Sequence, residues 1–237
     1  MYVFVLIVFI FSIGAIFGWC LEVVYRRLAD KEKRWVNPGF CVGPWLPIYG
    51  TGLLTAFGIS FFDKYIDLGN VVLEKIILFA IMSILMTLIE LIAGELLLKF
   101  FNLRLWDYSN EKYNYKGFIC LKFSIYWMLI SAAYYFFIHP LIQDAVIWLS
   151  KNLIFSFSVG LFFGVFLIDI IYSSNVLVKV RNIAQEAGIT VRLEELKDTI
   201  NRKQKLAESK ATFFFFMLKD DLRDLIKKAS DNLSPMR

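Results

Sequence analysis

Four acidic residues lie within or at the ends of long apolar stretches of this sequence: Glu22, Glu90, Glu95 and Asp169. A charged side chain inside a membrane costs on the order of a few kcal/mol, so such residues usually face a cavity or a partner. Glu22 precedes Arg26 by four residues, the spacing of an ion pair on one helix face. Glu90 has no basic residue three or four positions away. Glu90 is therefore the first candidate for a site that binds or carries charge.

Each of these acids also has a structural interpretation. Glu22 and Arg26 can form a simple helix-end ion pair, and Glu90 can pair with a group on another helix or stay protonated. Glu95 lies five residues after Glu90, about 140° around a helix, so the two do not share a face. Asp169 is near a helix end, from which its side chain can reach the membrane interface.

The clearest signal for irregular backbone is the segment 37–52, which has four glycines and three prolines among sixteen residues. A regular helix is not expected there, and only the residues 48–62 remain as helix, about 22 Å. Non-helical backbone at membrane depth is tolerated only inside protein or along a cavity. The segment is therefore either a structural elbow or a wall whose backbone amides hold an anion or ion. Its candidate residues are Asn37, Gly39, Gly43, Pro44, Pro47, Tyr49 and Gly50.

The sequence offers little for catalysis or metal binding. The three cysteines have no CxxC spacing and are expected to pack as buried thiols. His139 is expected at the outer interface, on the opposite side from Cys41 and Cys120. No nucleophile elbow and no G-x-x-x-x-G-K-[ST] motif occurs, so the chain cannot hydrolyse ATP by that route. We expect no metal and no cofactor, and an enzymatic role is left open but not favoured.

The composition indicates which elements position these residues. The 237 residues are 58% hydrophobic and 20% charged, with a mean hydropathy of +0.60. These values exclude a water-soluble enzyme and a disordered chain. Segments of about 20 apolar residues can span a bilayer, and five occur here: 2–24, 42–62, 71–98, 117–138 and 145–172. We predict an all-α integral membrane protein with about five transmembrane helices.

The basic residues predict the orientation of these helices. With the N-terminus outside and the C-terminus inside, the segments 25–41 and 99–116 and the tail place 22 of the 26 basic residues in the cytoplasm. Each of the two external loops then holds one basic residue. Because cytoplasmic loops carry the excess of Lys and Arg, this orientation is strongly preferred. The sequence thus predicts a multi-pass protein of the cell membrane.

We divide the chain into a transmembrane domain, 1–175, and a basic helical cytoplasmic tail, 176–237. The tail holds 13 basic and 9 acidic residues. Helices are expected at 176–187, 191–208 and 211–229. The last one carries a phenylalanine run at 213–216 beside several basic residues, so it can lie on the anionic inner leaflet. It can equally pack on the protein's own helices or on a second subunit. Interleaved acids argue against nucleic acid as a partner.

Two cytoplasmic segments have a similar order of residues, which suggests a parallel repeat of spans one and two in spans three and four. In each, an acid late in a span precedes bases, a tryptophan, an asparagine, a Gly-Phe and a cysteine. The paired positions are Glu22 with Glu95, Trp35 with Trp106, Asn37 with Asn114, and Gly39 with Gly117. Transporters place binding sites at such repeat interfaces. Chance similarity is the alternative.

Residues 17–22 (FGWCLE), 37–50 (NPGFCVGPWLPIYG), 105–109 (LWDYS), 114–121 (N-x-x-G-x-I-C-L) and 123–127 (FSIYW) together resemble the ABC-transporter type IV family of membrane proteins. The resemblance covers about residues 10–130, the first four spans. It implies a small multispanning protein, often assigned as a permease, and supplies no substrate or catalytic residue. The chain departs from the family pattern at Lys112 and Tyr113. The matching positions are Glu22, Gly39, Gly43, Pro44, Pro47, Gly50, Trp106, Asp107, Tyr108, Asn114 and Gly117.

Three functions fit the sequence. The first is a permease or transport-associated subunit, working with a separate ATPase or with an ion carried by Glu90 or Glu22. The second is an adaptor or assembly protein that acts through the basic tail. The third is a membrane enzyme acting on a lipid, with Glu95 and Asp107 at the cytoplasmic interface. The buried acids, the broken span and the repeat favour the first. The expected partners are the bilayer, a separate protein subunit and a second copy of the chain.

Overall fold

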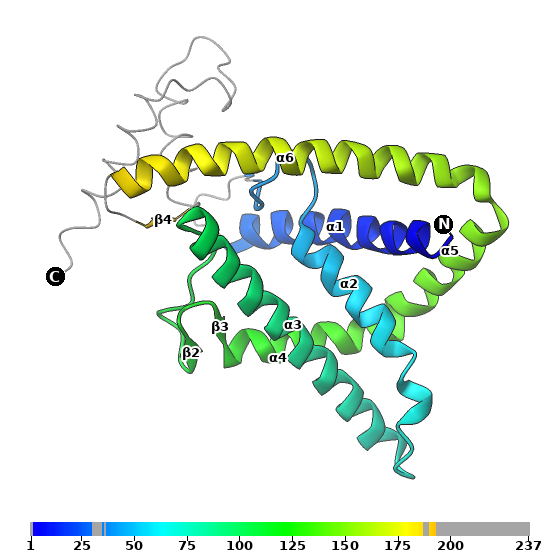
Figure 1. The fold of residues 1–237 in the computed structure, drawn as a ribbon. Coiled ribbons are helices and arrows are strands. Elements are labelled where there is room, and N and C mark those ends of the chain that lie inside the picture. Colours follow the sequence, from blue (N-terminus) through cyan, green and yellow to red (C-terminus); the bar gives the residue numbers. More distant parts are fainter. Residues whose placement is uncertain (1, 30–34, 36, 187–189, 193–237) are drawn as a thin grey trace. The chain divides into compact units, whose positions relative to one another are not determined.

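The protein is described by a computed structural model that covers residues 2–29, 35, 37–186 and 190–192, and it is dominated by helix (Figure 1). The α-helices are α1 (Tyr2–Ala29), α2 (Pro47–Ser60), α3 (Val71–Phe101), α4 (Leu121–Ala133), α5 (His139–Lys151) and α6 (Ser156–Glu186). The short helical turns are η1 (Asp63–Tyr65), the π-helical η2 (Tyr134–Ile138) and η3 (Leu153–Phe155). The strands are β1 (Leu103–Arg104), β2 (Asn114–Tyr115), β3 (Ile119–Cys120) and β4 (Val191–Arg192). The predicted all-α membrane fold is confirmed.

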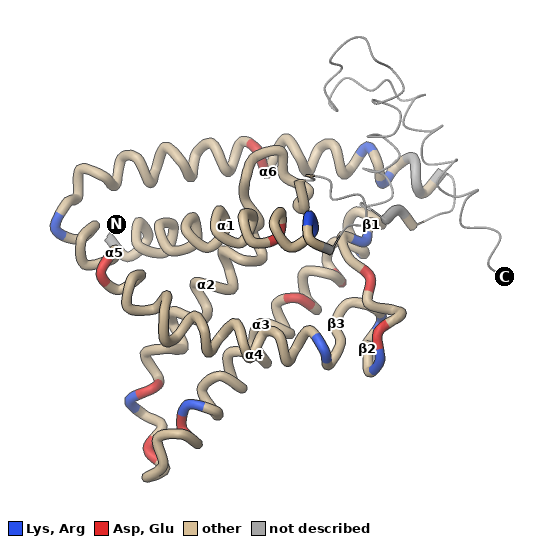
Figure 2. The backbone as a smooth tube through the Cα atoms, turned by 180° about the vertical axis from the view of Figure 1, so that it is seen from behind, with Lys and Arg blue, Asp and Glu red and all other residues tan. Residues whose placement is uncertain are grey.

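Four helical stretches of the described chain are long and apolar enough to cross a membrane: Val3–Leu28, Val71–Phe101, Leu121–Lys151 and Leu153–Asn182. The predicted segment 42–62 differs, because α2 has 14 residues, about 21 Å of helix against a hydrocarbon core of about 30 Å. The residues before α2 are not helical, as the glycines and prolines predict. Figure 2 shows long uncharged stretches along the helices, with most charged residues near helix ends or in loops.

The predicted limits of the fourth and fifth segments are wrong where the two meet. The helical chain continues from α4 through η2 into α5, and it turns only at Asn152. Pro140 does not end the helix; it lies in the first turn of α5, directly after the π-helical η2, in which the His139 N–H bonds to the Tyr134 carbonyl five residues back. Residues 145–151 therefore belong to the fourth crossing and not to the fifth.

The chain divides into two compact units, which are described separately. The first is Met1–Ile92 with Tyr108–Ile170, and the second is Ala93–Asp107 with Ile171–Arg237. In the first unit α1 and α6 lie side by side (Figure 1). Phe4 contacts Phe163 and Phe11 contacts Phe166, with ring centroids 6.0 and 5.2 Å apart. Because both contacts advance in the same direction, α1 and α6 run parallel.

Helix α2 runs antiparallel to α1 and packs on it through glycines. A Cβ atom added to Gly18 would lie 2.2 Å from the Tyr49 side chain, and one added to Gly14 would lie 2.7 Å from Leu53. These separations are far inside van der Waals contact, so only glycine permits this approach of the two helices. The contact brings Tyr49 of α2 against the C-terminal half of α1.

Helix α3 lies antiparallel to α2, and α4 antiparallel to α3. Ala56 of α2 packs in one core cluster with Leu78, Phe79 and Met82 of α3 and with Tyr134 of η2. Met86 lies against Gly52, and Ser83 donates to the Ser124 carbonyl over 2.6 Å. Helices α1, α3 and α6 therefore point one way, and α2 and α4 the other. The predicted topology requires this alternation of helix directions. Which side of the membrane each helix end faces stays a prediction.

A second polar group joins η1, α3 and η2. The Lys75 ammonium donates to both Asp63 oxygens over 2.6 Å and to the Tyr135 hydroxyl over 2.7 Å, and Tyr135 donates to Asp63 over 2.5 Å. His139 is buried, 2.8 Å from the Tyr134 hydroxyl. Side-chain hydrogen bonds thus join η1, the start of α3 and η2 to one another.

The cysteines only partly follow the prediction. Cys41 and Cys120 are buried, but Cys20 is exposed. Gly18 marks the face of α1 that meets α2, and Cys20 follows it by two residues, about 200° around the helix. Its thiol therefore points away from the packed face.

The second unit holds the end of α3, the β1–β4 pair and the end of α6. Leu103 and Arg104 pair in parallel with Val191 and Arg192, so the helix predicted over 191–208 is wrong at its first two residues. Helix α6 continues through the predicted domain boundary at residue 175 to Glu186, and the division into domain and tail stays a prediction. The expected helices beyond residue 192 lie outside the described residues.

Candidate functional site

Glu90 of α3 is almost completely buried, with 4% of its surface exposed. The Tyr108 hydroxyl donates to one carboxylate oxygen over 2.9 Å, and the Trp127 indole N–H donates to the other over 3.1 Å. Tyr108 lies in the loop after α3, and Trp127 lies on α4. In the part of the chain that the structure describes, these hydrogen-bond donors are both neutral. The expectation that Glu90 finds a partner on another helix is met by Trp127.

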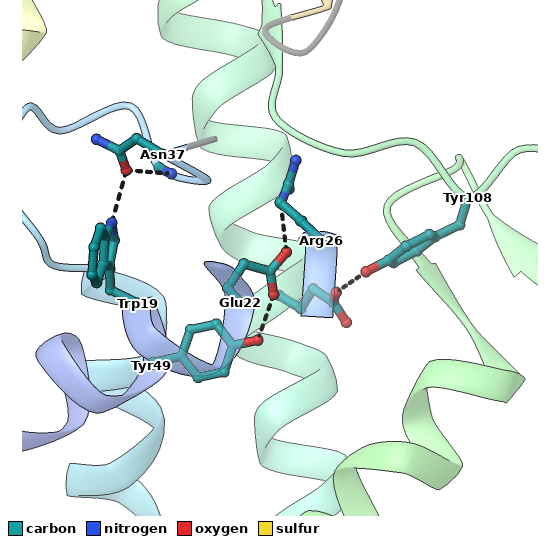
Figure 3. Close-up of polar contacts among 8 residues, drawn as sticks. Trp19, Glu22, Arg26, Asn37, Tyr49 and Tyr108 are labelled. Atoms are coloured by element: carbon teal, nitrogen blue, oxygen red, sulfur yellow. Dashed lines mark hydrogen bonds and ion pairs between the residues drawn. The ribbon is translucent and has the colours of Figure 1, made fainter. Parts of the chain in front are cut away.

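Glu22 of α1 has a charged partner as well as a neutral one (Figure 3). The Arg26 guanidinium lies 2.9 Å from one carboxylate oxygen, which confirms the predicted i,i+4 pair. The Tyr49 hydroxyl of α2 donates to the other oxygen over 2.9 Å. The side chains of Arg26 and Glu22 are 24% and 21% exposed, so the pair is only partly withdrawn from solvent.

The two carboxylates share one polar neighbourhood. The rings of Tyr49 and Trp127, which serve Glu22 and Glu90 respectively, lie 5.9 Å apart. Burial, with the negative charges of Glu90 and Glu22 close by, raises the pKa of the Tyr108 phenol. The charges of both Glu90 and Glu22 therefore act on the Tyr108 hydroxyl. We call this group the paired-carboxylate cluster, and its members are Glu22, Arg26, Tyr49, Glu90, Tyr108 and Trp127.

The cluster is suited to holding a positive charge or a proton. Two carboxylates close together repel each other unless a cation or a shared proton lies between them. Arg26 offsets the charge of Glu22, whereas the Tyr108 hydroxyl and the Trp127 indole that donate to Glu90 carry no charge. Tyrosine hydroxyls both donate and accept hydrogen bonds, so Tyr49 and Tyr108 can follow a change in the charge of either acid.

A structured turn holds Tyr108 in place. Its N–H donates to the Gly117 carbonyl over 2.8 Å, and its ring stacks on Phe123 with centroids 4.3 Å apart. The Asn114 amide donates to the Ser109 carbonyl and accepts from the Gly117 N–H. Gly117 has φ +73°, a left-handed conformation that favours glycine. Asn114 and Gly117 thus shape the turn that delivers Tyr108 to Glu90.

Asn37 performs a similar role in the non-helical segment before α2. Its Oδ1 atom accepts from the Trp19 indole over 2.9 Å, as Figure 3 shows, and its Nδ2 atom donates to the Cys41 carbonyl over 2.9 Å. The Leu46 N–H donates to the Ala15 carbonyl of α1 over 2.9 Å. These bonds fix the segment on α1 at both ends.

The backbone amides of this segment are occupied by a carboxylate of the chain itself. That carboxylate belongs to Asp169 of α6. It accepts from the Val42 N–H over 3.2 Å, the Gly43 N–H over 3.0 Å and the Trp45 indole over 2.6 Å. Successive N–H groups of this kind make a favourable seat for an anion.

The remaining predicted residues have packing roles or belong to the second unit. Gly39, Gly43 and Gly50 each lie so close to a side chain that an added Cβ would approach within 2.6, 2.1 and 2.8 Å. Pro47 lies in the first turn of α2, and Pro44 precedes it in the non-helical segment. Within the second unit, Glu95 and Trp106 are exposed and half-buried respectively, and Asp107 lies 3.6 Å from Arg104.

The structure changes the proposed pairing of the repeat. Glu90, and not Glu95, resembles Glu22, since each accepts from an aromatic side chain on the following helix of its pair, Trp127 or Tyr49. Each loop also holds an asparagine that accepts from a following glycine N–H, in the pairs Asn37–Gly39 and Asn114–Gly117. The repeat itself stays a prediction, because α2 is much shorter than the helix from Leu121 to Lys151.

The sequence matches the family described as "Putative ABC-transporter type IV" over residues 9–174. The chain belongs to this family. The family match extends past the predicted limit at about residue 130 and takes in the apolar part of α6. No curated protein and no solved structure matches the chain. With four helices of spanning length, the family makes this a multi-pass membrane protein associated with transport. The whole paired-carboxylate cluster lies within the matched family residues.

Sequence reasoning missed the three indoles that organise the family member's polar groups. Trp19, Trp45 and Trp127 donate to Asn37, Asp169 and Glu90 respectively. A signal was present for all three, because each lies in a stretch on which the family resemblance rests. A general signal is that a buried tryptophan N–H needs an acceptor, and few acceptors occur in these spans. Among the described residues, no three His, Cys, Asp or Glu side chains gather as a metal site.

Proposed function

We propose that this chain is the membrane-embedded permease subunit of a transport system in the cell membrane, with the paired-carboxylate cluster on its pathway. The observation that carries the proposal is Glu90, which is 4% exposed and bonded to Tyr108 and Trp127. Keeping an acid at this depth is costly, and such acids in spanning helices commonly serve an ion or substrate path. Its neighbour Glu22 comes from the other helix pair.

The energy source is proposed to be a separate subunit. The sequence has no G-x-x-x-x-G-K-[ST] motif, and the family name refers to transporters that use an ATPase. Glu22 and Glu90 offer the alternative of ion coupling, because two neighbouring acids can take up and release a proton or a small cation. The adaptor and lipid-enzyme roles would need residues of the tail or a substrate groove, and no described contact favours either.

The first experiment is gentle solubilisation of the tagged full-length protein from its native membrane, with mass spectrometry of what co-purifies. A stoichiometric ATPase supports a permease subunit of the ABC type. If no ATPase appears, the protein is reconstituted in vesicles that hold a pH-sensitive dye, and proton uptake is measured under a potassium diffusion potential.

The variant Glu90→Gln tests whether the Glu90 carboxylate takes part in transport or only supports the fold. Loss of uptake, or of ATP-driven transport by the complex, is expected in Glu90→Gln at normal expression. Glu74→Gln, the same change on the same helix but outside the cluster, is the matched control. Absence of both an ATPase partner and an ion flux overturns the permease role.

A further inference from the structure

The seat occupied by Asp169 is a set of three N–H donors that converge on one carboxylate. The Val42 and Gly43 amides and the Trp45 indole lie 3.2, 3.0 and 2.6 Å from its oxygens. Bonds from N–H groups to an ionised carboxylate are stronger than bonds between neutral groups. Because phosphate and carboxylate oxygens accept hydrogen bonds in the same way, this donor set recognises oxyanions in general.

The donors are held in place without help from Asp169. The segment is bonded to α1 through Trp19 and Asn37 at one end and through the Leu46 N–H and the Ala15 carbonyl at the other. The Asn37 amide also donates to the Cys41 and Val42 carbonyls, which orients the peptide groups around them. The two backbone donors therefore keep their positions when the carboxylate of α6 leaves the seat.

Asp169 lies on a weakly buried helix. Only 6% of the most apolar window of the Leu153–Asn182 stretch is buried, and in the first unit α6 contacts α1 and Trp45 mainly through Phe162, Phe163 and Phe166. The contacts that a shift of α6 would disrupt there are chiefly those of Phe162 and Phe166 with Trp45 and of Phe166 with Phe11. Val42 is 44% exposed, so one side of the seat is open to an incoming group.

We propose that the donors of Val42, Gly43 and Trp45 form an anion-binding site in which Asp169 is the built-in occupant. An external oxyanion, a phosphate or carboxylate group, competes with Asp169 for the same three donors. The site opens as Asp169 is displaced, so ligand binding and the position of α6 are coupled. In transporters with discontinuous helices, the N-termini of half-helices point at anionic substrate groups, and the three donors here lie just before the N-terminus of α2. The inference rests on the donors alone and holds or fails independently of the permease role.

The test measures binding of inorganic phosphate to the purified full-length protein by titration calorimetry, in non-ionic detergent at constant ionic strength. Asp169→Ala empties the seat and is expected to tighten phosphate binding by about tenfold or more relative to the wild type. Adding Trp45→Phe to Asp169→Ala removes a donor and should reverse most of this gain. Asp67→Asn, a change of an exposed loop acid, is the control and should match the wild type.

The outcomes separate the proposal from a purely structural latch. Equal phosphate binding by the wild type and Asp169→Ala, or an unchanged affinity after Trp45→Phe, overturns the proposal. Should Asp169→Ala not fold, Asp169→Asn keeps the size of the side chain and removes its charge, and the same comparison applies. If neither Asp169 variant accumulates, phosphate binding is compared between the wild type and Trp45→Phe. Weaker binding by Trp45→Phe supports the site, and equal binding refutes it.

A second ligand identifies the source of the oxyanion. The same titration uses a short-chain, water-soluble phosphatidic acid in place of inorganic phosphate. Tighter binding of the lipid than of phosphate assigns the site to a lipid headgroup, and the reverse order assigns it to a free anion. Failure of both ligands in Asp169→Ala overturns the site altogether.

Discussion

The hydroxyl of Tyr108, in the loop after α3, lies 2.9 Å from a carboxylate oxygen of Glu90, which is buried within α3. The loop after α3 thus returns to an acid that lies about three helical turns before the end of that helix. This bond couples the shape of the turn at 108–118 to the charge of the buried acid. The relationship is open to direct measurement.

We expect Tyr108→Phe to destabilise the protein by about 1.5 to 3 kcal/mol, the usual contribution of a hydrogen bond to a charged group. Unfolding in mixed dodecyl sulfate micelles, followed by circular dichroism, measures this change. Tyr113→Phe is the matched control, because Tyr113 is in the same turn and is 82% exposed. In a Glu90→Gln background the effect of Tyr108→Phe should shrink, since the two residues share one bond. Full additivity of the two changes would contradict the bond.

We expect Gly18→Ala to destabilise the protein by about 1 to 3 kcal/mol, as for an overpacked core position. The new methyl group would lie 2.2 Å from the Tyr49 side chain and force α1 and α2 apart. Gly58→Ala in α2 is the control, because nothing lies within 4 Å of an added Cβ there. This control should be neutral or should stabilise by up to about 1 kcal/mol. Equal effects of the two substitutions would refute the close packing.

Gly18→Ala should also disturb the paired-carboxylate cluster. Tyr49 donates to Glu22, so a displaced Tyr49 leaves that acid with Arg26. The transport measurement for Glu90→Gln, repeated on Gly18→Ala, should show reduced activity. Normal activity in a destabilised Gly18→Ala protein would mean that the Tyr49 bond does not serve function.

The Asp63 carboxylate should make stability sensitive to acid. Partial burial opposes its ionisation, but the hydrogen bonds from Lys75 and Tyr135 and the Lys75 charge outweigh this and hold the Asp63 pKa below its usual 3.8. A lowered native pKa stabilises the fold fully above about pH 4, and this contribution falls as pH drops toward the native pKa. The melting temperature of Asp63→Asn should therefore lie below that of the wild type near pH 6, and the gap should narrow below pH 4. A difference in melting temperature that does not change with pH would refute the role of the Asp63 carboxylate. Asp67→Asn is the control variant.

Labelling with a membrane-impermeant maleimide tests the orientation. In a background without native cysteines, Lys64→Cys and Lys151→Cys should react in intact cells, because both loops are predicted outside. Tyr113→Cys should react only after the membrane is permeabilised. The exposed position of Tyr113 ensures that a missing signal reports topology and not burial. The opposite pattern would invert the predicted orientation.

Local spacing predicted those parts of the site that depend on a single helix. The Glu22–Arg26 pair follows from i,i+4 geometry, and the search for distant partners of Glu90 follows from the lack of a base at helical spacing. The break before α2 follows from its glycines and prolines. Each of these features is decided by residues within a turn or two of one another.

Local spacing misled where neighbours in space decide the outcome. The fourth apolar segment is predicted to end at residue 138, but η2 and α5 continue the helix through Pro140 to Lys151. The repeat pattern pairs Glu95 with Glu22, but by its bonds with Trp127 and Tyr108 it is Glu90 that resembles Glu22. The pattern alone does not show which of two acids five residues apart faces α4, because this depends on how the two helices pack.

By itself the sequence determined the membrane class, the apolar helices, the predicted orientation and the family, because hydropathy and charge act along the chain whatever the packing. Tertiary structure alone decided that Tyr49 and Trp127 bring Glu22 and Glu90 into one neighbourhood, and that Asp169 occupies the amides of Val42 and Gly43. These contacts join residues far apart in sequence. Their formation depends on the glycine-mediated approach of α1 to α2 and on the parallel packing of α6 on α1, which no local signal encodes.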